Sequence, residues 1–460
     1  MDVAEGIDFG TDGWRARLSE FTEPRVRLVG HAVADYLDEE GPPGPVAIGY
    51  DARERSEEFA DAIAEAIAAH GRTVHRSERD CPTPVLAWTV ADGSYAAGCM
   101  ITASHNPPEY NGIKVLPADG SPAPTTVTAA IEARLGTVEP DARKTAGTQV
   151  TIDMIEPYLE HASGLFDADL GGVEVAYDGM HGSGRGVTDT LLERAGADVV
   201  RIRCERDPSF GGSAPEPEPE RVQELIERVT SGDAELGIVN DGDADRIGVV
   251  TPDRGYLDPN RLFAALYAFL LESESGDVVR TVSTSSLVDR VATAHGHSVH
   301  ETAVGFKWIA AAMAEHNALV GGEESGGFGL RGHLRNKDGV AIALATTTAA
   351  AAQSLDDRVA SIIATHGEIH QDRVSLNCPD ERKERVIEKL ADALPSAVAG
   401  TAVDSVNDVD GFKIHLTDGG WLLVRPSGTE PKLRLYAEGQ SSERVNELLR
   451  AGQNLVEPLI

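Results

Sequence analysis

The sequence predicts an α/β protein with three related α/β domains, mixed sheets and a smaller α+β domain at the C-terminal end. The chain has 460 residues, and at about 150 residues per domain this length corresponds to roughly three domains. Short apolar runs alternate with amphipathic helical patterns over most of the chain, which is typical of α/β units with mostly parallel strands. After about residue 370 several strand patterns follow one another, which indicates a separate α+β domain.

The first two α/β domains are predicted over residues 1–150 and 151–254. In the first, VAIGY at 46–50, GCMIT at 98–102 and IKVL at 113–116 predict strands, and a helical pattern runs from Ser56 to about His70. In the second, VEVAYD, DVVRIR and LGIVN predict strands, with helices near 187–195 and from about 220. PEPEPE at 215–220 predicts an extended lead-in to the latter helix, because alternating prolines exclude a helix.

The third and fourth domains are predicted over residues 255–368 and 369–460. In the third, DVVRTV and ALVGG predict strands, and a helix follows Asp338. In the fourth, a helix is predicted at 381–394, strands at GFKIHL, WLLVRP and KLRLYAEG, and a last helix from Ser442.

The composition limits the partners and the compartment. The chain carries 75 acidic and 41 basic residues, a formal net charge of −34, with eight lysines against 33 arginines. This pattern is typical of salt-loving organisms, with an acidic protein of an ordinary cytoplasm as the alternative. We expect no nucleic-acid or membrane partner, since both are polyanionic. Widely spaced cysteines and the lack of an apolar run of about 18 residues predict a cytoplasmic protein without disulfides or zinc, and nothing indicates its oligomeric state.

A carboxylate cluster follows the predicted strand LGIVN. In DGDADR, Asp241, Asp243 and Asp245 are spaced two residues apart, so an extended or curled loop turns them to one side. Three such carboxylates repel one another unless they face water or hold a cation. The place of the loop at the C-terminal end of a strand favours Mg²⁺ over a solvated acidic turn.

Two further loops carry residues suited to phosphate chemistry. TASHNP places Ser104 and His105 after a strand, where the serine is a nucleophile, a phosphoryl carrier or a capping residue of an Asn-Pro turn. Neighbours in an extended chain point apart, so we expect no Ser104–His105 catalytic pair. RPSGTEPKLR combines a Ser-Gly-Thr turn with arginines and a lysine, which favours a phosphate site over a hairpin with solvated cations.

The glycine-rich segment GGEESGG at 321–327 offers Glu323 and Ser325 to sugar hydroxyls, with a flexible acidic turn as the alternative. GFGLRG at 327–332 matches a dinucleotide-binding pattern, but no helix start follows it, so we expect no dinucleotide site.

In chain order, FGTDGWR, TASHNPPEYNGIK, DGDADR, GEESGG and RPSGTEPKLR resemble the signature loops of the α-D-phosphohexomutase family. The five loops span residues 9–434, nearly the whole chain. The resemblance implies four domains around a central cleft, and we expect the last domain to hinge so that a bisphosphorylated sugar can turn end for end. It also implies a Mg²⁺-dependent enzyme that interconverts hexose 1-phosphate and hexose 6-phosphate through a phosphoserine and a hexose 1,6-bisphosphate.

The resemblance assigns roles residue by residue. It implies a Mg²⁺ site made by the phosphoserine Ser104 with Asp241, Asp243 and Asp245. Around the transferring phosphoryl group it places Arg15, His105, Arg246 and Lys114, the last as general acid or base. It implies sugar contacts from Glu323 and Ser325, a substrate contact from Lys307, and a phosphate loop of Arg425, Ser427, Gly428, Thr429 and Arg434.

The preferred sugar is predicted to be glucose, with mannose as a further substrate. Gly327 follows Ser-Gly in the sugar loop, where some mannose- and glucosamine-directed members carry histidine. The alternatives are a phosphoglucosamine mutase, a catalytically idle sugar-phosphate-binding paralogue and a metal-dependent phosphatase.

Overall fold

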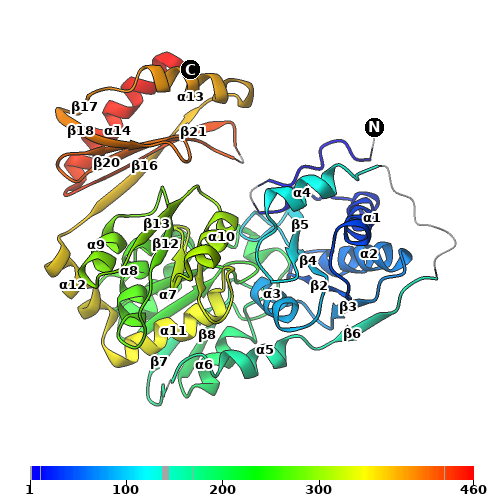
Figure 1. Ribbon diagram of the computed structural model, residues 1–460. Coiled ribbons are helices and arrows are strands. Elements are labelled where there is room, and N and C mark those ends of the chain that lie inside the picture. The colour runs from blue at the N-terminus through cyan, green and yellow to red at the C-terminus, as the bar shows by residue number, and fades with distance from the viewer. Residues whose placement is uncertain (1–2, 11, 137–144, 168, 429) are drawn as a thin grey trace.

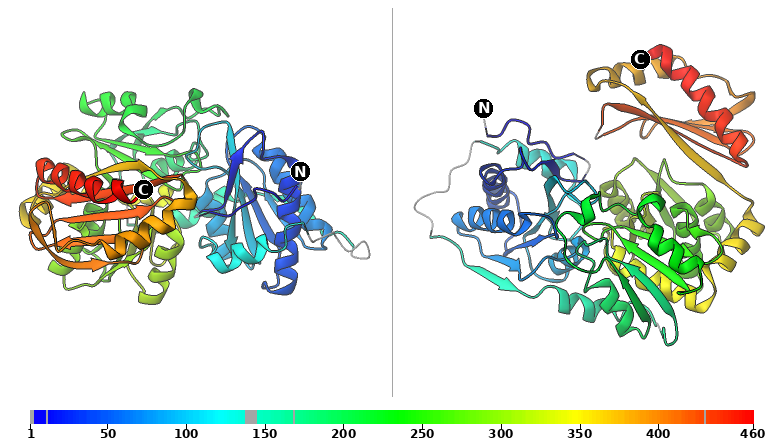
Figure 2. Two further views of the ribbon diagram at one scale, coloured as in Figure 1. Left: turned by 90° about the horizontal axis from the view of Figure 1, so that it is seen from above. Right: turned by 180° about the vertical axis from the view of Figure 1, so that it is seen from behind.

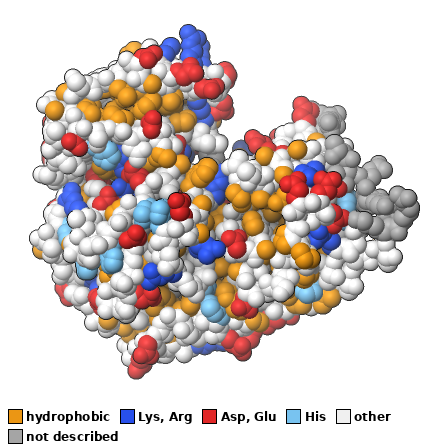
Figure 3. All heavy atoms as spheres, in the orientation of Figure 1, with side chains coloured by type: hydrophobic (Ala, Val, Ile, Leu, Met, Phe, Trp, Pro, Cys, Tyr) orange, Lys and Arg blue, Asp and Glu red, His pale blue; other side chains and the backbone are white. Residues whose placement is uncertain are grey.

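The computed structural model describes residues 3–10, 12–136, 145–167, 169–428 and 430–460. Its strands form four sheets that follow one another along the chain. Figures 1 and 2 show the second and third sheets at the centre, with the first domain on one side and the C-terminal domain packed above the third. The surface is hollowed between the first and the C-terminal domains (Figure 3). The predicted fold class is confirmed.

The first sheet has six strands in the order β1-β5-β4-β2-β3-β6. The pairs β1–β5 and β4–β5 are antiparallel and the others are parallel, which makes this a mixed sheet. Its strands are β1 (Trp14–Arg17), β2 (Val46–Tyr50), β3 (Val74–Ser77), β4 (Ala97–Ile101), β5 (Tyr110–Pro117) and β6 (Gln149–Ile152). Its helices are α1 (Glu23–Glu39), α2 (Ser56–Ala69), α3 (Thr83–Asp92) and α4 (Thr125–Glu132).

The second sheet has the order β11-β10-β9-β7-β8. Its strands are β7 (Glu174–Asp178), β8 (Asp198–Ile202), β9 (Leu236–Asn240), β10 (Ile247–Thr251) and β11 (Gly255–Tyr256). Its helices are α5 (Ile155–Ala162), α6 (Thr188–Arg194) and α7 (Gln223–Thr230). The helix predicted from about 220 begins with a single 3-10 turn at Pro219–Arg221, after the extended proline segment.

The third sheet has the order β13-β12-β14-β15. Its strands are β12 (Val278–Thr281), β13 (Val299–Thr302), β14 (Val320–Gly322) and β15 (Phe328–Leu330). Its helices are α8 (Pro259–Leu270), α9 (Leu287–Ala294), α10 (Phe306–His316), α11 (Gly339–Ala352) and α12 (Leu355–His366). One hydrophobic core runs from α3 through α5, β7 and α6 to α8 and α11, so the first three domains pack as one body.

The fourth sheet is antiparallel throughout, in the order β16-β21-β20-β19-β18-β17. Its strands are β16 (His370–Asn377), β17 (Ala397–Val398), β18 (Thr401–Asn407), β19 (Phe412–Leu416), β20 (Trp421–Pro426) and β21 (Lys432–Gly439). The helices α13 (Asp380–Asp392) and α14 (Ser442–Val456) accompany it, and its core is separate from the other three. A small apolar cluster of Val282, Trp421, Leu423 and Tyr436 joins it to the third domain.

The described part of the chain contains no helix long and apolar enough to cross a membrane.

Candidate active site

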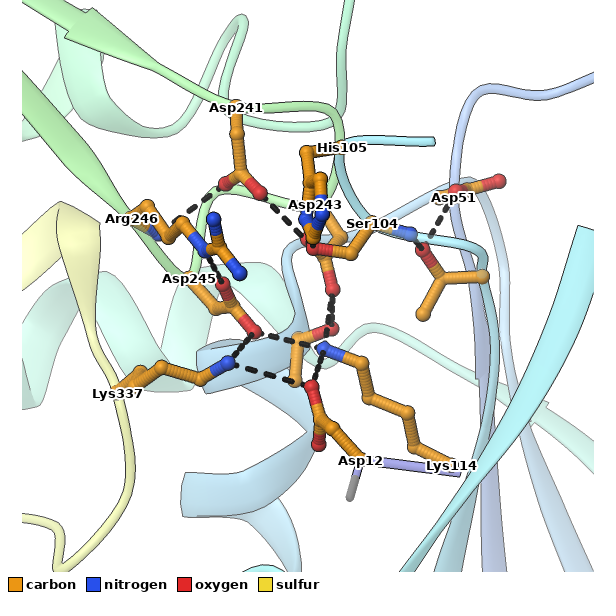
Figure 4. A network of polar contacts seen from close by, with 12 residues as sticks. Asp12, Asp51, Ser104, His105, Lys114, Asp241, Asp243, Asp245, Arg246 and Lys337 are labelled. Carbon is orange, nitrogen blue, oxygen red and sulfur yellow. Dashed lines mark hydrogen bonds and ion pairs between the residues drawn. The ribbon is translucent and has the colours of Figure 1, made fainter. Parts of the chain in front are cut away.

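Segments from three domains meet in one buried polar network (Figure 4). The loop after β4 supplies Ser104 and His105, and β5 supplies Lys114. The loop between β9 and β10 supplies the carboxylates of Asp241, Asp243 and Asp245, followed by Arg246. The segment before β1 supplies Asp12, and the turn before α11 supplies Lys337.

A buried ion pair holds the loop that carries Ser104. Arg53 is 1% exposed, and its Nε donates to Asp51 Oδ2 at 3.0 Å. The other guanidinium nitrogens of Arg53 donate to backbone carbonyls of the loop, those of Ser104, Asn106, Pro107 and Tyr110. Since one planar cation serves so many carbonyls, the loop has a defined conformation before any ligand binds.

The backbone at Ser104 is left-handed, with φ = 51°. Its amide donates to Thr102 Oγ1 at 2.8 Å, and Thr102 in turn donates to Asp51 at 2.6 Å, which holds this uncommon conformation. The chain is therefore not extended here, and Ser104 Oγ lies 3.4 Å from His105 Nδ1. The expectation that these neighbours point apart is wrong, because it assumed extended backbone.

The three carboxylates of the 241–245 loop lie together. One oxygen from each lies within 4.8 Å of the others, and all three residues are buried. Asp241 Oδ2 accepts a 2.9 Å hydrogen bond from Ser104 Oγ, and Asp241 Oδ1 accepts one of 3.1 Å from the Arg246 amide. The Oδ1 atoms of Asp243 and Asp245 are buried without a hydrogen-bond partner among the described residues.

Lys114 neutralises part of this cluster from the first domain. Its Nζ lies 2.9 Å from Asp243 Oδ2, 2.7 Å from Asp245 Oδ2 and 3.1 Å from Asp12 Oδ2. Thr83 Oγ1 donates to the same Asp243 oxygen at 2.6 Å. The Oδ2 atoms of Asp243 and Asp245 are thus held by protein donors, whereas their Oδ1 atoms accept no hydrogen bond from the described residues.

The electrostatics follow from this arrangement. Burial and the charges of Asp243 and Asp245 raise the pKa of Asp241 well above its usual value. Burial alone would raise the pKa of Asp243 as well, but Lys114 and the Thr83 hydrogen bond outweigh it and lower that pKa. Burial, together with the charge of Arg246, lowers the pKa of His105 well below its usual value, so its imidazole is neutral.

These residues fit a hard divalent cation. Mg²⁺ prefers carboxylate oxygens, and the buried Oδ1 atoms of Asp243 and Asp245 have no hydrogen-bond donor among the described residues, so a bound cation or water would satisfy them. Asp241, Asp243 and Asp245 would hold the ion, with Ser104 Oγ or a phosphoryl oxygen carried on it beside Asp241. The structure brings these four predicted ligands together.

Arg15 lies at the rim of the same network. Its guanidinium donates to Asn106 Oδ1 at 3.0 Å and pairs with Asp12 at 3.2 Å. Arg246 follows the three carboxylates, with Nε 3.9 Å from Asp245 and Nη1 3.9 Å from Glu216. The structure therefore places both of these predicted cations in the same network, and their role around a phosphoryl group stays a prediction.

The predicted sugar loop packs against the second sheet. Glu323 is 8% exposed, and its Oε1 accepts a 3.0 Å hydrogen bond from the Gly305 amide. Ser325 Oγ lies 3.5 Å from Glu323 Oε2. Gly326 has φ = 82°, and a Cβ there would lie 2.4 Å from the Ile247 carbonyl oxygen, so the loop requires glycine at this position. Burial raises the pKa of Glu323.

The predicted phosphate loop lies in the C-terminal domain, and the structure ties it to local acids. Arg425 Nε donates to Asp410 at 2.9 Å, and Arg434 and Lys432 pair with Glu430 at 2.8 and 2.7 Å. Ser427 and Gly428 lie in the turn between β20 and β21, and Thr429 lies outside the described residues.

Lys307 is placed apart from the metal cluster, with its Nζ 3.0 Å from Thr125 Oγ1 at the start of α4.

Several network residues were not singled out by the sequence analysis. Asp12 lies in FGTDGWR, three residues before Arg15. Lys337 is one of only eight lysines, and this scarcity was the sequence signal that could have indicated it. Arg53 and Asp51 follow the strand VAIGY directly, as the aspartates follow LGIVN. Thr83 carried no signal, because only the fold brings it to Asp243.

Comparison with known proteins agrees with this geometry. The chain matches the phosphoglucomutase/phosphomannomutase α/β/α domain I over residues 6–142, domain II over 156–255, domain III over 258–366 and the C-terminal domain over 374–451. A probable phosphoglucosamine mutase of Methanopyrus kandleri is 33% identical over 449 residues, which is 96% of each chain. A phosphoglucomutase/phosphomannomutase of Thermococcus kodakarensis is 32% identical over 467 residues, 98% of each.

Solved structures give the same result. A crystal structure from Thermus thermophilus, assigned as a phosphomannomutase, superposes with a TM-score of 0.84 at 31% identity and covers 98% of this chain and 99% of that one. Similarity over four domains and nearly the full length leaves no part of the fold unmatched. The chain therefore belongs to the α-D-phosphohexomutase family, and it is an enzyme that moves a phosphoryl group within a sugar phosphate.

Proposed function

We propose that this enzyme interconverts glucose 1-phosphate and glucose 6-phosphate, with mannose phosphates as further substrates, through phosphorylated Ser104 and a hexose 1,6-bisphosphate. The observation that carries the proposal is the contact of Ser104 Oγ with Asp241, beside two buried carboxylate oxygens without hydrogen-bond partners among the described residues. A phosphoryl carrier and a cation site are thereby adjacent, and phosphoryl transfer depends chiefly on positioning and charge neutralisation.

In the first transfer, a sugar hydroxyl oxygen forms a bond to the phosphorus on Ser104 as the bond from Ser104 Oγ to phosphorus breaks. The proton of the attacking hydroxyl ends on Ser104 Oγ, so the protein ends unphosphorylated with a neutral serine and the sugar ends bisphosphorylated. The second transfer is the reverse, at the other phosphate. Asp241, Asp243 and Asp245 would hold Mg²⁺, which when bound would neutralise charge on the phosphoryl oxygens.

Lys114 contributes as an ammonium. Three carboxylate oxygens lie within 3.1 Å of its Nζ, an environment that keeps the group protonated and makes it suited to donate a proton rather than to remove one. His105, whose pKa is lowered, is neutral, and its Nδ1 lies 3.4 Å from Ser104 Oγ, so it orients that oxygen as a neutral imidazole. Arg15 and Arg246 flank the loop as fixed positive charges.

The remaining contacts to substrate are assigned to the other loops. Glu323 and Ser325 face sugar hydroxyls, and Lys307 contributes from α10. The phosphate that is not transferred is held by the turn of Arg425, Ser427, Gly428, Thr429 and Arg434. These cations already pair with Asp410 and Glu430, so substrate phosphate replaces carboxylates as their partner. The bisphosphate reorients between transfers, which requires the C-terminal domain to hinge.

Phosphoglucosamine mutase is the second candidate, because the Methanopyrus kandleri relative carries that name at 33% identity. A coupled assay in molar KCl with Mg²⁺ and a trace of glucose 1,6-bisphosphate, offering glucose, mannose and glucosamine 1-phosphates in parallel, separates the candidates. We expect the highest kcat/KM for glucose 1-phosphate. A dominant rate on glucosamine 1-phosphate overturns the glucose assignment, and release of inorganic phosphate without 6-phosphate overturns the mutase assignment.

A further inference from the structure

Lys337 is a second buried lysine in the network, reaching it from the third domain. Its side chain is 4% exposed, and its Nζ lies 2.9 Å from Asp245 Oδ2 and 3.2 Å from Asp12 Oδ2 (Figure 4). Lys114 already donates to both of these oxygens. Since Lys114 alone can hold Asp245 in its orientation, the main contribution of Lys337 is one further positive charge.

The sugar loop makes room for this lysine. A Cβ on Gly327 would lie 2.5 Å from Lys337 Cδ and 2.8 Å from Lys337 Cγ, closer than side-chain carbons approach. Gly327 does not have a left-handed backbone, so the contact with Lys337, and not the conformation, requires glycine. The absence of a side chain at 327 and the presence of Lys337 in the network are thus one structural feature.

Lys337 offsets part of the negative charge of the network. Among the described residues, five carboxyl groups face four cations: Asp12, Glu216, Asp241, Asp243 and Asp245 against Arg15, Lys114, Arg246 and Lys337. Without Lys337 the network carries one more net negative charge, which favours a divalent cation and opposes a phosphate dianion.

We propose that Lys337, for which Gly327 leaves room, is a positioning residue that sets the relative affinities of the site for a divalent cation and for a phosphate dianion. It lowers the affinity of the carboxylate loop for Mg²⁺ and raises the affinity of the site for a sugar phosphate dianion. The cation half of the inference stands on the carboxylate cluster alone. The phosphate half rests on the proposed function.

Titration calorimetry at a fixed KCl concentration measures both affinities. The two probes are Mg²⁺ alone and glucose 1,6-bisphosphate in the presence of Mg²⁺. For Lys337→Met we expect Mg²⁺ to bind about tenfold tighter and the bisphosphate about tenfold weaker, the effect of one buried charge removed at short range. Lys389→Met is the control, since Lys389 lies on the exposed face of α13 and bonds to the Leu459 carbonyl, and we expect no change in either affinity.

Gly327→Ala tests the same inference independently, because the added Cβ would displace the Lys337 side chain. We expect it to shift both affinities in the direction of Lys337→Met, and the double variant to equal Lys337→Met alone, because the clash disappears with the lysine stem. Additive effects of the two substitutions overturn the coupling. Where Lys337→Met fails to fold, Gly327→Ala carries the test by itself.

The outcomes separate this inference from the proposed function. Unchanged or weaker Mg²⁺ binding by Lys337→Met overturns the role of Lys337 toward the cation, whatever the substrate. Tighter Mg²⁺ binding supports that role, and if the wild-type enzyme then fails to bind the bisphosphate, the proposed substrate is wrong while the role of Lys337 toward the cation stands.

Discussion

Ser104 Oγ donates a 2.9 Å hydrogen bond to Asp241 Oδ2, although 137 residues separate them in the chain. The contact joins the loop after β4 of the first sheet to the loop after β9 of the second. Both loops follow fully buried strands, so the backbone that delivers the two side chains is rigid on both sides. Ser104, the proposed phosphoryl carrier, and the proposed cation site are therefore aligned by the packing of two domains, before any ligand binds.

Replacement of the carrier tests its role. We expect Ser104→Ala to lower kcat by at least about 10⁴-fold, the scale for loss of a covalent nucleophile, while the thermal midpoint changes little, because only one oxygen atom is removed. Coupled kinetics and differential scanning calorimetry measure the two effects. Ser183→Ala is the matched control, since its buried hydroxyl has no hydrogen-bond partner among the described residues. Substantial activity of Ser104→Ala would sink the assignment.

Replacement of a proposed metal ligand separates binding from folding. Asp243→Asn removes a charge whose Oδ1 has no partner among the described residues, so we expect the Mg²⁺ dissociation constant to rise more than about 100-fold. Because a ligand that binds only the native state stabilises it, we expect Mg²⁺ to raise the thermal midpoint of the wild type and the variant to lose this increase. Asp189→Asn, a buried acid of α6 paired with Arg201, should keep it. Equal Mg²⁺ stabilisation of both variants would contradict the site.

The sequence was sufficient where one segment carries both its strand and its chemistry. DGDADR directly follows the apolar run LGIVN, so the carboxylates and the strand that positions them were visible together. Likewise, the helix predicted from Ser56 to about His70 is α2 (Ser56–Ala69). Most of the fold and the candidate metal ligands could be predicted for this reason.

The network around those ligands could not be predicted, because it is assembled from different domains. Asp12 and Lys337 belong to segments that only tertiary packing brings to the predicted Lys114, with both lysine Nζ atoms within 3.2 Å of Asp12. The left-handed backbone at Ser104 likewise depends on Thr102 and on Arg53 from a separate loop. Local sequence patterns contain no information about such contacts.

The buried ion pair of Arg53 with Asp51, which supports the Ser104 loop, provides a test of stability. Arg53→Met leaves Asp51 buried without its cation and removes the donors to the loop carbonyls, so we expect a loss of about 3–5 kcal/mol in the free energy of unfolding. Arg55→Met, two residues later, breaks a surface pair with Glu58 and a cation–π contact with the Phe59 ring, and should cost about 1 kcal/mol. Urea titrations measure both. A similar loss for the two variants would show that the buried Arg53–Asp51 pair stabilises the fold no more than the surface interactions of Arg55 do.

The acidic composition predicts a dependence on salt. A formal net charge of −34 destabilises the compact state by self-repulsion, which salt screens. We expect the thermal midpoint to rise between about 0.2 M and 2 M KCl, where the Debye length falls from roughly 7 to about 2 Å. Sucrose at matched osmolality is the control for excluded-solute effects. A midpoint that is flat or falls with KCl would contradict adaptation to high salt.

A buried lysine between the third and C-terminal domains predicts a pH dependence. Lys413 on β19 is fully buried, and its Nζ lies 2.6 Å from Glu301 Oε2 and 4.4 Å from the ring centre of Trp421. Burial and the nearby charge of Arg280 lower the pKa of Lys413 to about 8, despite the attraction of Glu301. At neutral pH the lysine is therefore charged and paired across the domain contact.

Between about pH 8 and the usual lysine value near 10.4, the unfolded chain holds this proton and the native protein does not. Stability rises with pH wherever the unfolded state binds more protons. We therefore expect the stability of the wild type, relative to Lys413→Met, to rise across this window by up to about 3 kcal/mol. Urea titrations of both proteins at pH 7.5, 9 and 10 measure the difference, which cancels the titration of all other groups. A difference that falls with pH would mean that the ion pair with Glu301, rather than burial, dominates at Lys413.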